Sequence, residues 1–152
     1  MHREHCWIQI VDTPIDIESL RGKVDHPDVG AHGWFVGVTR RTTGTRKTET
    51  LSYESHVPMA IRQLEKLADA AIEKFSLHRL VIVHRLGEVP VGQASVVVGC
   101  SSSHRVEIFQ ALSWVMDTLK KEIPIWKREI YVDGTTEWVH PTGADASGES
   151  KA

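Results

Sequence analysis

The stretch ASVVVGCSSSHRVEIFQALSWVMDTLKKEIPIWKREIYV, residues 94–132, decides the fold of this 152-residue chain. It begins with a β-rich run at residues 94–100, whose three consecutive valines predict a strand buried on both faces. Apolar residues then recur at helical spacing over residues 104–122, and Pro124 ends that helix. A second strand is predicted at residues 125–132. Strand, long helix and strand in succession indicate helices packed on a sheet.

The rest of the chain alternates between strand-like and helix-like segments in the same way. The clearest helix is Val57–Phe75, where apolar residues recur every three or four positions. A short N-terminal helix is expected to have Thr13 as its N-cap and Pro14 at its first position, and to end near Val24. Further strands are predicted at Cys6–Val11 and at residues 30–38, 49–55, 79–86 and 137–139. The pattern predicts an α/β or α+β sandwich with two long helices on a mostly antiparallel sheet.

A basic loop separates two of these strands. Residues 40–47 contain four cations and no acid: Arg40, Arg41, Arg46 and Lys47. Because strands are predicted at residues 30–38 and 49–55, we expect a hairpin with a basic tip. The tip is either a solvated turn or an anion-gripping loop, since the planar fork of arginine matches phosphate and carboxylate.

Composition narrows the class of protein. The chain has 18 Lys and Arg against 20 Asp and Glu, a formal net charge of -2, which argues against a generic nucleic-acid coat. Its apolar runs are far shorter than the ~20 residues that cross a bilayer, so no membrane segment is expected. The start of the chain has no signal-peptide pattern. The two cysteines, Cys6 and Cys100, make no disulfide framework, so we expect a cytoplasmic protein.

We expect one domain over residues 1–140, followed by a tail. Residues 141–152, PTGADASGESKA, contain no large apolar side chain. Such a segment cannot offset the conformational entropy lost on ordering, so we expect it to be disordered.

The start of the second long helix carries cations. Ser101, Ser102 and Ser103 are N-cap candidates, and His104 and Arg105 follow in the first turn. Cations oppose the helix dipole there and are better explained if an anion binds beside them. The alternative is an exposed His–Arg pair that tolerates a small cost in stability.

The end of that helix and the next strand carry a second group of cations. Lys120 and Lys121 lie where the helix dipole favours cations, so either alone needs no functional explanation. Lys127 and Arg128 are neighbours on a strand, so one of the two must face the packed side of the sheet or a cleft. Clustered cations would lower the pKa of a lysine and suit it to proton transfer.

Other chemistries lack support in the sequence. His2, His5 and Cys6 resemble a metal cluster, but no matching Cys or His pair appears elsewhere, so no metal site is predicted. Cys100, in an apolar strand, is expected to be a buried thiol. The phosphate-binding loop, the dinucleotide fingerprint, the serine-hydrolase elbow and the zinc-protease motif are all missing.

Six motifs together resemble a known family: FVGVTR at 35–40, LSYE at 51–54, HRLG at 84–87, SSHR at 102–105, LK at 119–120 and PIWKRE at 124–129. In order and spacing, over residues 30–139, they resemble the large, catalytic subunit of molybdopterin synthase. The resemblance implies an α/β hammerhead fold of the α+β class and a homodimer. It also implies a partner, a small ubiquitin-like sulfur-carrier subunit with a C-terminal Gly-Gly thiocarboxylate. The implied enzyme is a sulfurtransferase of molybdenum cofactor biosynthesis, which converts cyclic pyranopterin monophosphate into the molybdopterin dithiolene.

The resemblance also implies site residues. Lys120 and Lys127 match the essential lysines of the family, and the matched substrate-binding positions are Arg40, His104, Arg105 and Phe35. The chain departs from the family pattern at His56 and Gln93, outside those positions. A phosphate-bearing substrate and a thiocarboxylate are both anions, so a cationic pocket would offset their repulsion. Because the carrier brings the sulfur, the enzyme would need no cofactor, metal or catalytic cysteine.

Two other functions compete with this interpretation. A non-catalytic binding module for a small acidic protein or a phosphorylated ligand would use the same basic surface without turnover. A small RNA-binding domain is the weaker alternative, because the net charge is negative and the basic elements offer no aromatic platforms.

Overall fold

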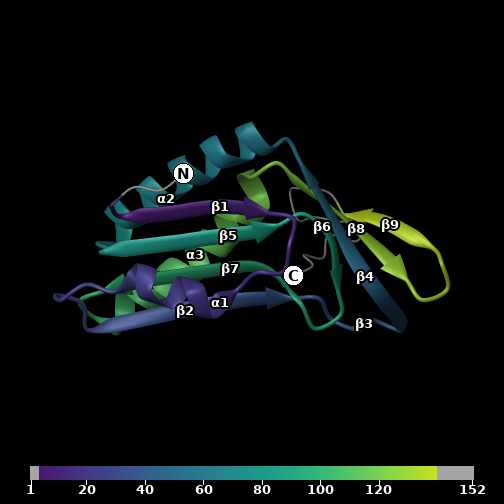
Figure 1. Cartoon of the computed structure of the whole chain (residues 1–152), viewed down its shortest axis with the longest axis horizontal. Coiled ribbons are helices and arrows are strands. Elements are labelled where there is room, and N and C mark those ends of the chain that lie inside the picture. Colours follow the sequence, from purple (N-terminus) through teal and green to yellow (C-terminus); the bar gives the residue numbers. More distant parts are fainter. Residues whose placement is uncertain (1–3, 140–152) are drawn as a thin grey trace.

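The computed structural model describes residues 4–139 and shows two sheets side by side, with helices on the first (Figure 1). In chain order the elements are β1 (Cys6–Val11), α1 (Ile17–Leu20), the 3-10 helix η1 (Arg21–Val24), β2 (Ala31–Val38), β3 (Thr42–Thr43), β4 (Arg46–Ser55), α2 (Val57–Phe75), β5 (Arg79–Arg85), β6 (Gly87–Pro90), β7 (Ala94–Ser102), α3 (Arg105–Glu122), β8 (Ile125–Tyr131) and β9 (Thr136–Val139). The fold is α+β, as the sequence predicts, with one short and two long helices. The short strands β3 and β6 were not predicted.

The first sheet has the strand order β1-β5-β7-β2, and only β1 and β5 run parallel. Helices α2 and α3 cover one face, over a core that includes Leu64, Ile82 and Val98. The other face is covered by α1 and η1, whose Leu20 and Val24 pack with apolar residues of β5 and β7. The valines at 96–98 are therefore buried on both faces, as predicted.

The second sheet has the order β3-β4-β8-β9, with β6 added along β4. The predicted hairpin between the second strand and β4 is wrong, because β2 pairs with β7 instead. Thr39 redirects the chain: its N–H donates to the Gln93 carbonyl (3.1 Å), its carbonyl accepts from the Gly92 N–H (2.9 Å) and its hydroxyl donates to the Val89 carbonyl (2.9 Å). Only the short strand β3 folds back on β4 at the basic loop.

The N-terminal helix begins three residues later than predicted. Asp16, rather than Thr13, is the N-cap: its carboxylate accepts from the Ser19 N–H at 3.4 Å. The Ser19 hydroxyl also donates to the Asp16 carbonyl at 2.7 Å. A charged carboxylate competes better than a hydroxyl for the first free N–H groups of a helix. The end at Val24 is as predicted, although the last turn is 3-10.

The two long helices start on histidine caps. At α2 the His56 Nδ1 accepts from the Met59 N–H (3.3 Å), so this departure from the family pattern caps a helix. At α3 the N-cap is His104, whose side chain makes no capping hydrogen bond. The predicted serine caps are wrong, because Ser101 and Ser102 complete β7 and hydrogen-bond along that strand through their backbones.

A close approach between α3 and β2 gives a test of this packing. A methyl group at Gly33 would overlap the Ile108 side chain and come within 3.1 Å of Leu112. We expect Gly33→Ala to lower the free energy of unfolding by about 1–3 kcal/mol through overpacking. Gly22→Ala is the control, because its nearest neighbour lies at 4.0 Å. Urea unfolding that ranks the two variants equally would contradict this helix–sheet contact.

Candidate functional site

The candidate site lies at one end of the first sheet, where it meets the second. Val38 at the end of β2 pairs with Ala94, and His84 near the end of β5 pairs with Val96, so both strands end where β7 begins. Helix α3 starts beyond the other end of β7 and packs back along β2 and β7. Its C-terminal turn, which carries Lys120, therefore returns to this same end.

The positive charge of Arg40 acts on the Lys120 ammonium. Arg40 is exposed and follows directly on Thr39, which is buried and hydrogen-bonded on three sides. Lys120 is half-buried. Burial lowers the pKa of Lys120, the nearby Asp117 carboxylate raises it, and the positive charge of Arg40 lowers it further. The net effect brings the Lys120 ammonium closer to its neutral form, which suits proton transfer.

Lys127 points into the protein from β8. Alternate residues of this strand are buried, namely Ile125, Lys127, Glu129 and Tyr131, and Lys127 is only 9% exposed. Its neighbour Arg128 lies on the other face, where its guanidinium lies 5.6 Å from the centre of the Trp138 ring. Of the two adjacent cations, Lys127 is thus the one that faces the packed side.

Two aromatic rings adjoin Lys127 on this inner face. Tyr53 of β4 is its cross-strand partner, and the Tyr53 ring meets the His84 ring of β5 edge-on, with centroids 5.0 Å apart. The pKa of His84 falls to about 4, mainly through burial and further through the Lys127 charge, although a hydrogen bond to the Arg85 backbone opposes the shift. His84 belongs to the HRLG motif of the family resemblance, but the resemblance assigned it no role at the site.

Glu129 places a buried carboxylate on the same face of β8 as Lys127. It is 3% exposed and accepts hydrogen bonds from the Thr43 hydroxyl (2.6 Å) and from the Thr48 hydroxyl. Both donors come from the β3–β4 hairpin, which the sequence did not predict, so this contact could not be foreseen. Its charge also contributes to raising the pKa of Tyr53, after the larger effect of burial.

His104 and Arg105 lie far from the two lysines within one chain. They are exposed and begin α3, whereas Lys120 is in its last turn. A helix of 18 residues is about 27 Å long. Phe35 lies between these ends, on β2, where it packs against the core under the helices. One chain therefore brings Arg40, Lys120, Lys127 and His84 to one end of the sheet and leaves His104 and Arg105 at the other.

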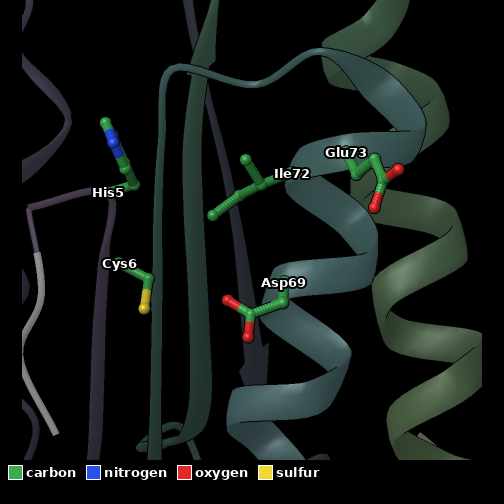
Figure 2. A pocket seen from close by; sticks show the side chains of 5 residues that line it. All are labelled: His5, Cys6, Asp69, Ile72 and Glu73. Atoms are coloured by element: carbon green, nitrogen blue, oxygen red, sulfur yellow. The ribbon is translucent and has the colours of Figure 1, made fainter.

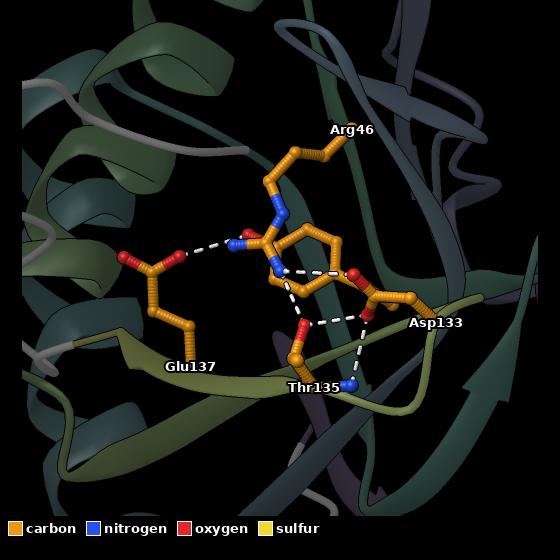
Figure 3. Close-up of polar contacts among 5 residues, drawn as sticks. Arg46, Asp133, Thr135 and Glu137 are labelled. Atoms are coloured by element: carbon orange, nitrogen blue, oxygen red, sulfur yellow. Dashed lines mark hydrogen bonds and ion pairs between the residues drawn. The ribbon is translucent and has the colours of Figure 1, made fainter.

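The basic loop is held by contacts between Arg46 and the segment from the end of β8 to the turn before β9. The Arg46 guanidinium stacks 3.4 Å from the centre of the Tyr131 ring, donates to the Thr135 hydroxyl and lies 3.9 Å from the Asp133 carboxylate (Figure 3). The Tyr131 hydroxyl donates to Glu137 at 2.8 Å. These contacts give Arg46 a structural role, so its presence in the loop needs no bound anion. Arg41 and Lys47 are exposed, as a solvated tip requires.

Cys100 is far less reactive than a catalytic thiol requires. Cys100 is fully buried and its pKa is raised to about 12 by burial, as expected for a core thiol. Cys6 lines a separate cavity of about 170 Å³ between β1 and α2, with His5, Asp69, Ile72 and Glu73. Figure 2 shows Asp69 reaching toward β1 and Glu73 turned away from it. No group of three or more ligating side chains within residues 4–139 could hold a metal. His2, which the sequence placed in that cluster, lies outside the described residues.

No helix among residues 4–139 is long and apolar enough to span a membrane. The fold and site thus define an α+β protein with cationic side chains, two of them at least half-buried, at the junction of two sheets. Such a junction suits the binding of anionic reactants.

Comparison with known proteins identifies the family. Residues 10–122 match the model described as MoaE protein, and the chain belongs to this family. A molybdopterin synthase catalytic subunit from Emericella nidulans is 42% identical over 128 residues, which are 84% of this chain and 66% of that protein. The chain thus spans just under two thirds of the length of this relative.

Solved structures share the fold. A molybdopterin synthase from Staphylococcus aureus superposes with a TM-score of 0.81 at 32% identity, covering 91% of this chain and 98% of that one. A complex of subunits 1 and 2 of molybdopterin-converting factor from Helicobacter pylori superposes with a TM-score of 0.72 at 19% identity, over 93% and 92% of the two chains, a similarity of fold.

The buried imidazole predicts a pH dependence of stability. His84 takes up a proton near pH 6.5 when unfolded but only near pH 4 when folded, so the unfolded state binds more protons between these values. The contribution of His84 to the free energy of unfolding is therefore complete above about pH 6.5 and is lost as the pH falls toward 4. The total loss is on the order of 3 kcal/mol. His84→Gln cannot titrate, so its deficit in unfolding free energy relative to wild type should shrink between pH 7 and pH 4.5. A deficit independent of pH, measured by urea unfolding, would contradict a neutral buried imidazole.

Proposed function

We propose that the chain is the catalytic subunit of a molybdopterin synthase, a cytoplasmic sulfurtransferase of molybdenum cofactor biosynthesis. Sulfur passes from the C-terminal thiocarboxylate of a small carrier subunit to cyclic pyranopterin monophosphate, and the product is the dithiolene of molybdopterin. The observation that carries the proposal is the gathering of Arg40, Lys120 and Lys127 at one end of the sheet, in a member of the MoaE family. Both cysteines are free and buried, which fits a reducing compartment.

The chemistry needs cations because both reactants are anions. The thiocarboxylate and the cyclic phosphate repel each other, and a fixed positive site offsets that repulsion better than water does. Arg40 is exposed, so it can meet the phosphate as the substrate arrives. Lys127 lies on the buried face of β8, so it can bind the narrow tail of the carrier and position the carrier's thiocarboxylate.

Lys120 is the residue best suited to proton transfer. It is half-buried, and burial together with Arg40 lowers its pKa, so the ammonium gives up a proton more readily than a solvated lysine. The same shift raises the fraction of Lys120 present as the free, nucleophilic amine, which also fits a transient covalent adduct with carrier or substrate.

A second copy of the chain supplies the remaining cations. His104 and Arg105 stand at the opposite end of α3, about 23 Å from Lys120 along the helix, so one chain cannot present them to one substrate. In a homodimer, His104 and Arg105 of one copy reach the Lys120 site of the other, where they hold the phosphate and pterin. Phe35 contributes an aromatic surface near the pterin. The carrier binds each copy, giving a heterotetramer. The Helicobacter pylori complex of subunits 1 and 2 supports the pairing with a second, different subunit.

The role of Lys120 is tested by molybdopterin formation from thiocarboxylated carrier and cyclic pyranopterin monophosphate. We expect Lys120→Ala to lower the rate about 10²–10³-fold. Lys120→Arg should be equally impaired, because arginine keeps the charge but does not release its proton. Lys121→Ala is the matched control, since Lys121 is exposed on the same helical turn, and it should turn over normally.

Full turnover by Lys120→Ala would remove that residue from the mechanism, and high activity of Lys120→Arg would leave it only an electrostatic role. A non-catalytic binding module predicts something different. It would retain the carrier or the phosphorylated ligand in every Lys→Arg variant, lose affinity steeply with salt and form no product.

The shared site is tested by mixing two inactive variants. Lys120→Ala and Arg105→Ala are each expected to lose most activity as pure dimers. After subunits are exchanged, each mixed dimer has one site with both defects and one with neither, so about a quarter of all sites recover. If the mixture is no more active than its components, Lys120 and Arg105 do not act across a dimer.

A further inference from the structure

We propose that His84 is a positioning residue for Lys127. The buried imidazole of His84 provides an uncharged nitrogen that accepts a hydrogen bond from the Lys127 ammonium at the inner end of the site. The proposal rests on the proposed function, because it takes Lys127 as the lysine that holds the carrier's thiocarboxylate. His84 does not touch the reactants itself, since it is only 4% exposed.

The His84 ring is fixed by two contacts. Its Nδ1 lies 2.9 Å from the backbone carbonyl of Arg85. A carbonyl oxygen only accepts, so Nδ1 carries the hydrogen and Nε2 keeps its lone pair. The ring also meets the Tyr53 ring edge-on, at an interplanar angle of 71°. Together these contacts set both the tautomer and the orientation of the imidazole.

Lys127 comes to the same place from the second sheet. It pairs directly with Tyr53 across β4 and β8, and such partners have Cβ atoms about 4.5–5.5 Å apart on the same face. Tyr53 thus touches His84 on one side and adjoins Lys127 on the other. The Lys127 charge also acts on His84, where it disfavours a protonated ring.

An uncharged acceptor suits this position. The groups that face His84 from neighbouring strands are Lys127 and Tyr53, with Glu129 one step further along β8. A protonated imidazole would repel the Lys127 ammonium, and burial keeps the ring neutral, with a pKa of about 4. A carboxylate in its place would neutralise the lysine. A neutral nitrogen holds the ammonium and leaves its charge available for an anionic reactant.

A purely structural role is the alternative, because the bond from His84 to the Arg85 carbonyl also secures the end of β5. Two substitutions separate the roles. In His84→Asn the side-chain amide reaches the position of Nδ1 and keeps a donor for the carbonyl, but nothing replaces Nε2. In His84→Gln the longer chain carries the amide oxygen to the position of Nε2. Both variants are neutral, polar and smaller than histidine.

The experiment follows Lys127 directly. The protein carries ¹³C- and ¹⁵N-labelled lysine, and the Lys127 resonance is assigned by its loss in Lys127→Arg. Its titration is measured in wild type, His84→Asn and His84→Gln, with kcat and KM for molybdopterin formation. His78→Asn is the control, because His78 lies just before β5, beside Ser103 and away from β8.

We expect His84→Asn to lower the pKa of Lys127 and to lower kcat about tenfold, with KM nearly unchanged, as the loss of a hydrogen bond to a charged group would do. His84→Gln should recover much of both. The proposal is overturned if Lys127 titrates alike in wild type and His84→Asn, or if the two variants behave alike. If wild-type protein forms no molybdopterin, the proposed function fails, whereas the titration still decides how His84 acts on Lys127.

Discussion

A lysine inside a sheet is the constraint on which the rest of this structure depends. Removing an ammonium from water costs several kcal/mol unless polar neighbours replace the water. Alternate residues of a strand share a face, and β8 buries Ile125 and Tyr131 on its inner face. Lys127 lies between them on that face and is therefore only 9% exposed. The Glu129 carboxylate and the rings of Tyr53 and His84 surround this charge. The junction of the two sheets is therefore polar at its centre, and there an anionic reactant gains most from a fixed cation.

The elements around this junction bring in the other cations by simple geometry. Strand β2 ends at the junction and Thr39 turns the chain there, so Arg40 emerges beside it. Helix α3 runs back along the sheet and ends at the same place with Lys120. The His104–Arg105 pair stands at the far end because it begins that same helix. On the proposed function, the single chain carries only part of the site, and a symmetric pair of chains would complete it twice.

Periodicity predicted the long elements well. The bounds of α2 and the two-faced burial of β7 follow from apolar spacing, which tertiary contacts reinforce. The pairing of β2 could not be predicted, because adjacency in sequence favoured a hairpin and the hydrogen bonds of Thr39 decided otherwise. In the site, alternation along β8 showed that one of two cations faces inward. The partners His84 and Glu129 depend on contacts between distant strands, which no local pattern reveals.

Central to the proposed function is that Lys120 and Lys127 serve a single anion-binding site. The most direct measurement is NMR of the labelled lysine ammonium groups during titration with a short peptide that ends in a Gly-Gly thiocarboxylate. The account predicts that the Lys120 and Lys127 resonances shift together, with one dissociation constant, while exposed Lys121 does not respond. Shifts with different dissociation constants, or a response of only one of the two lysines, would contradict it.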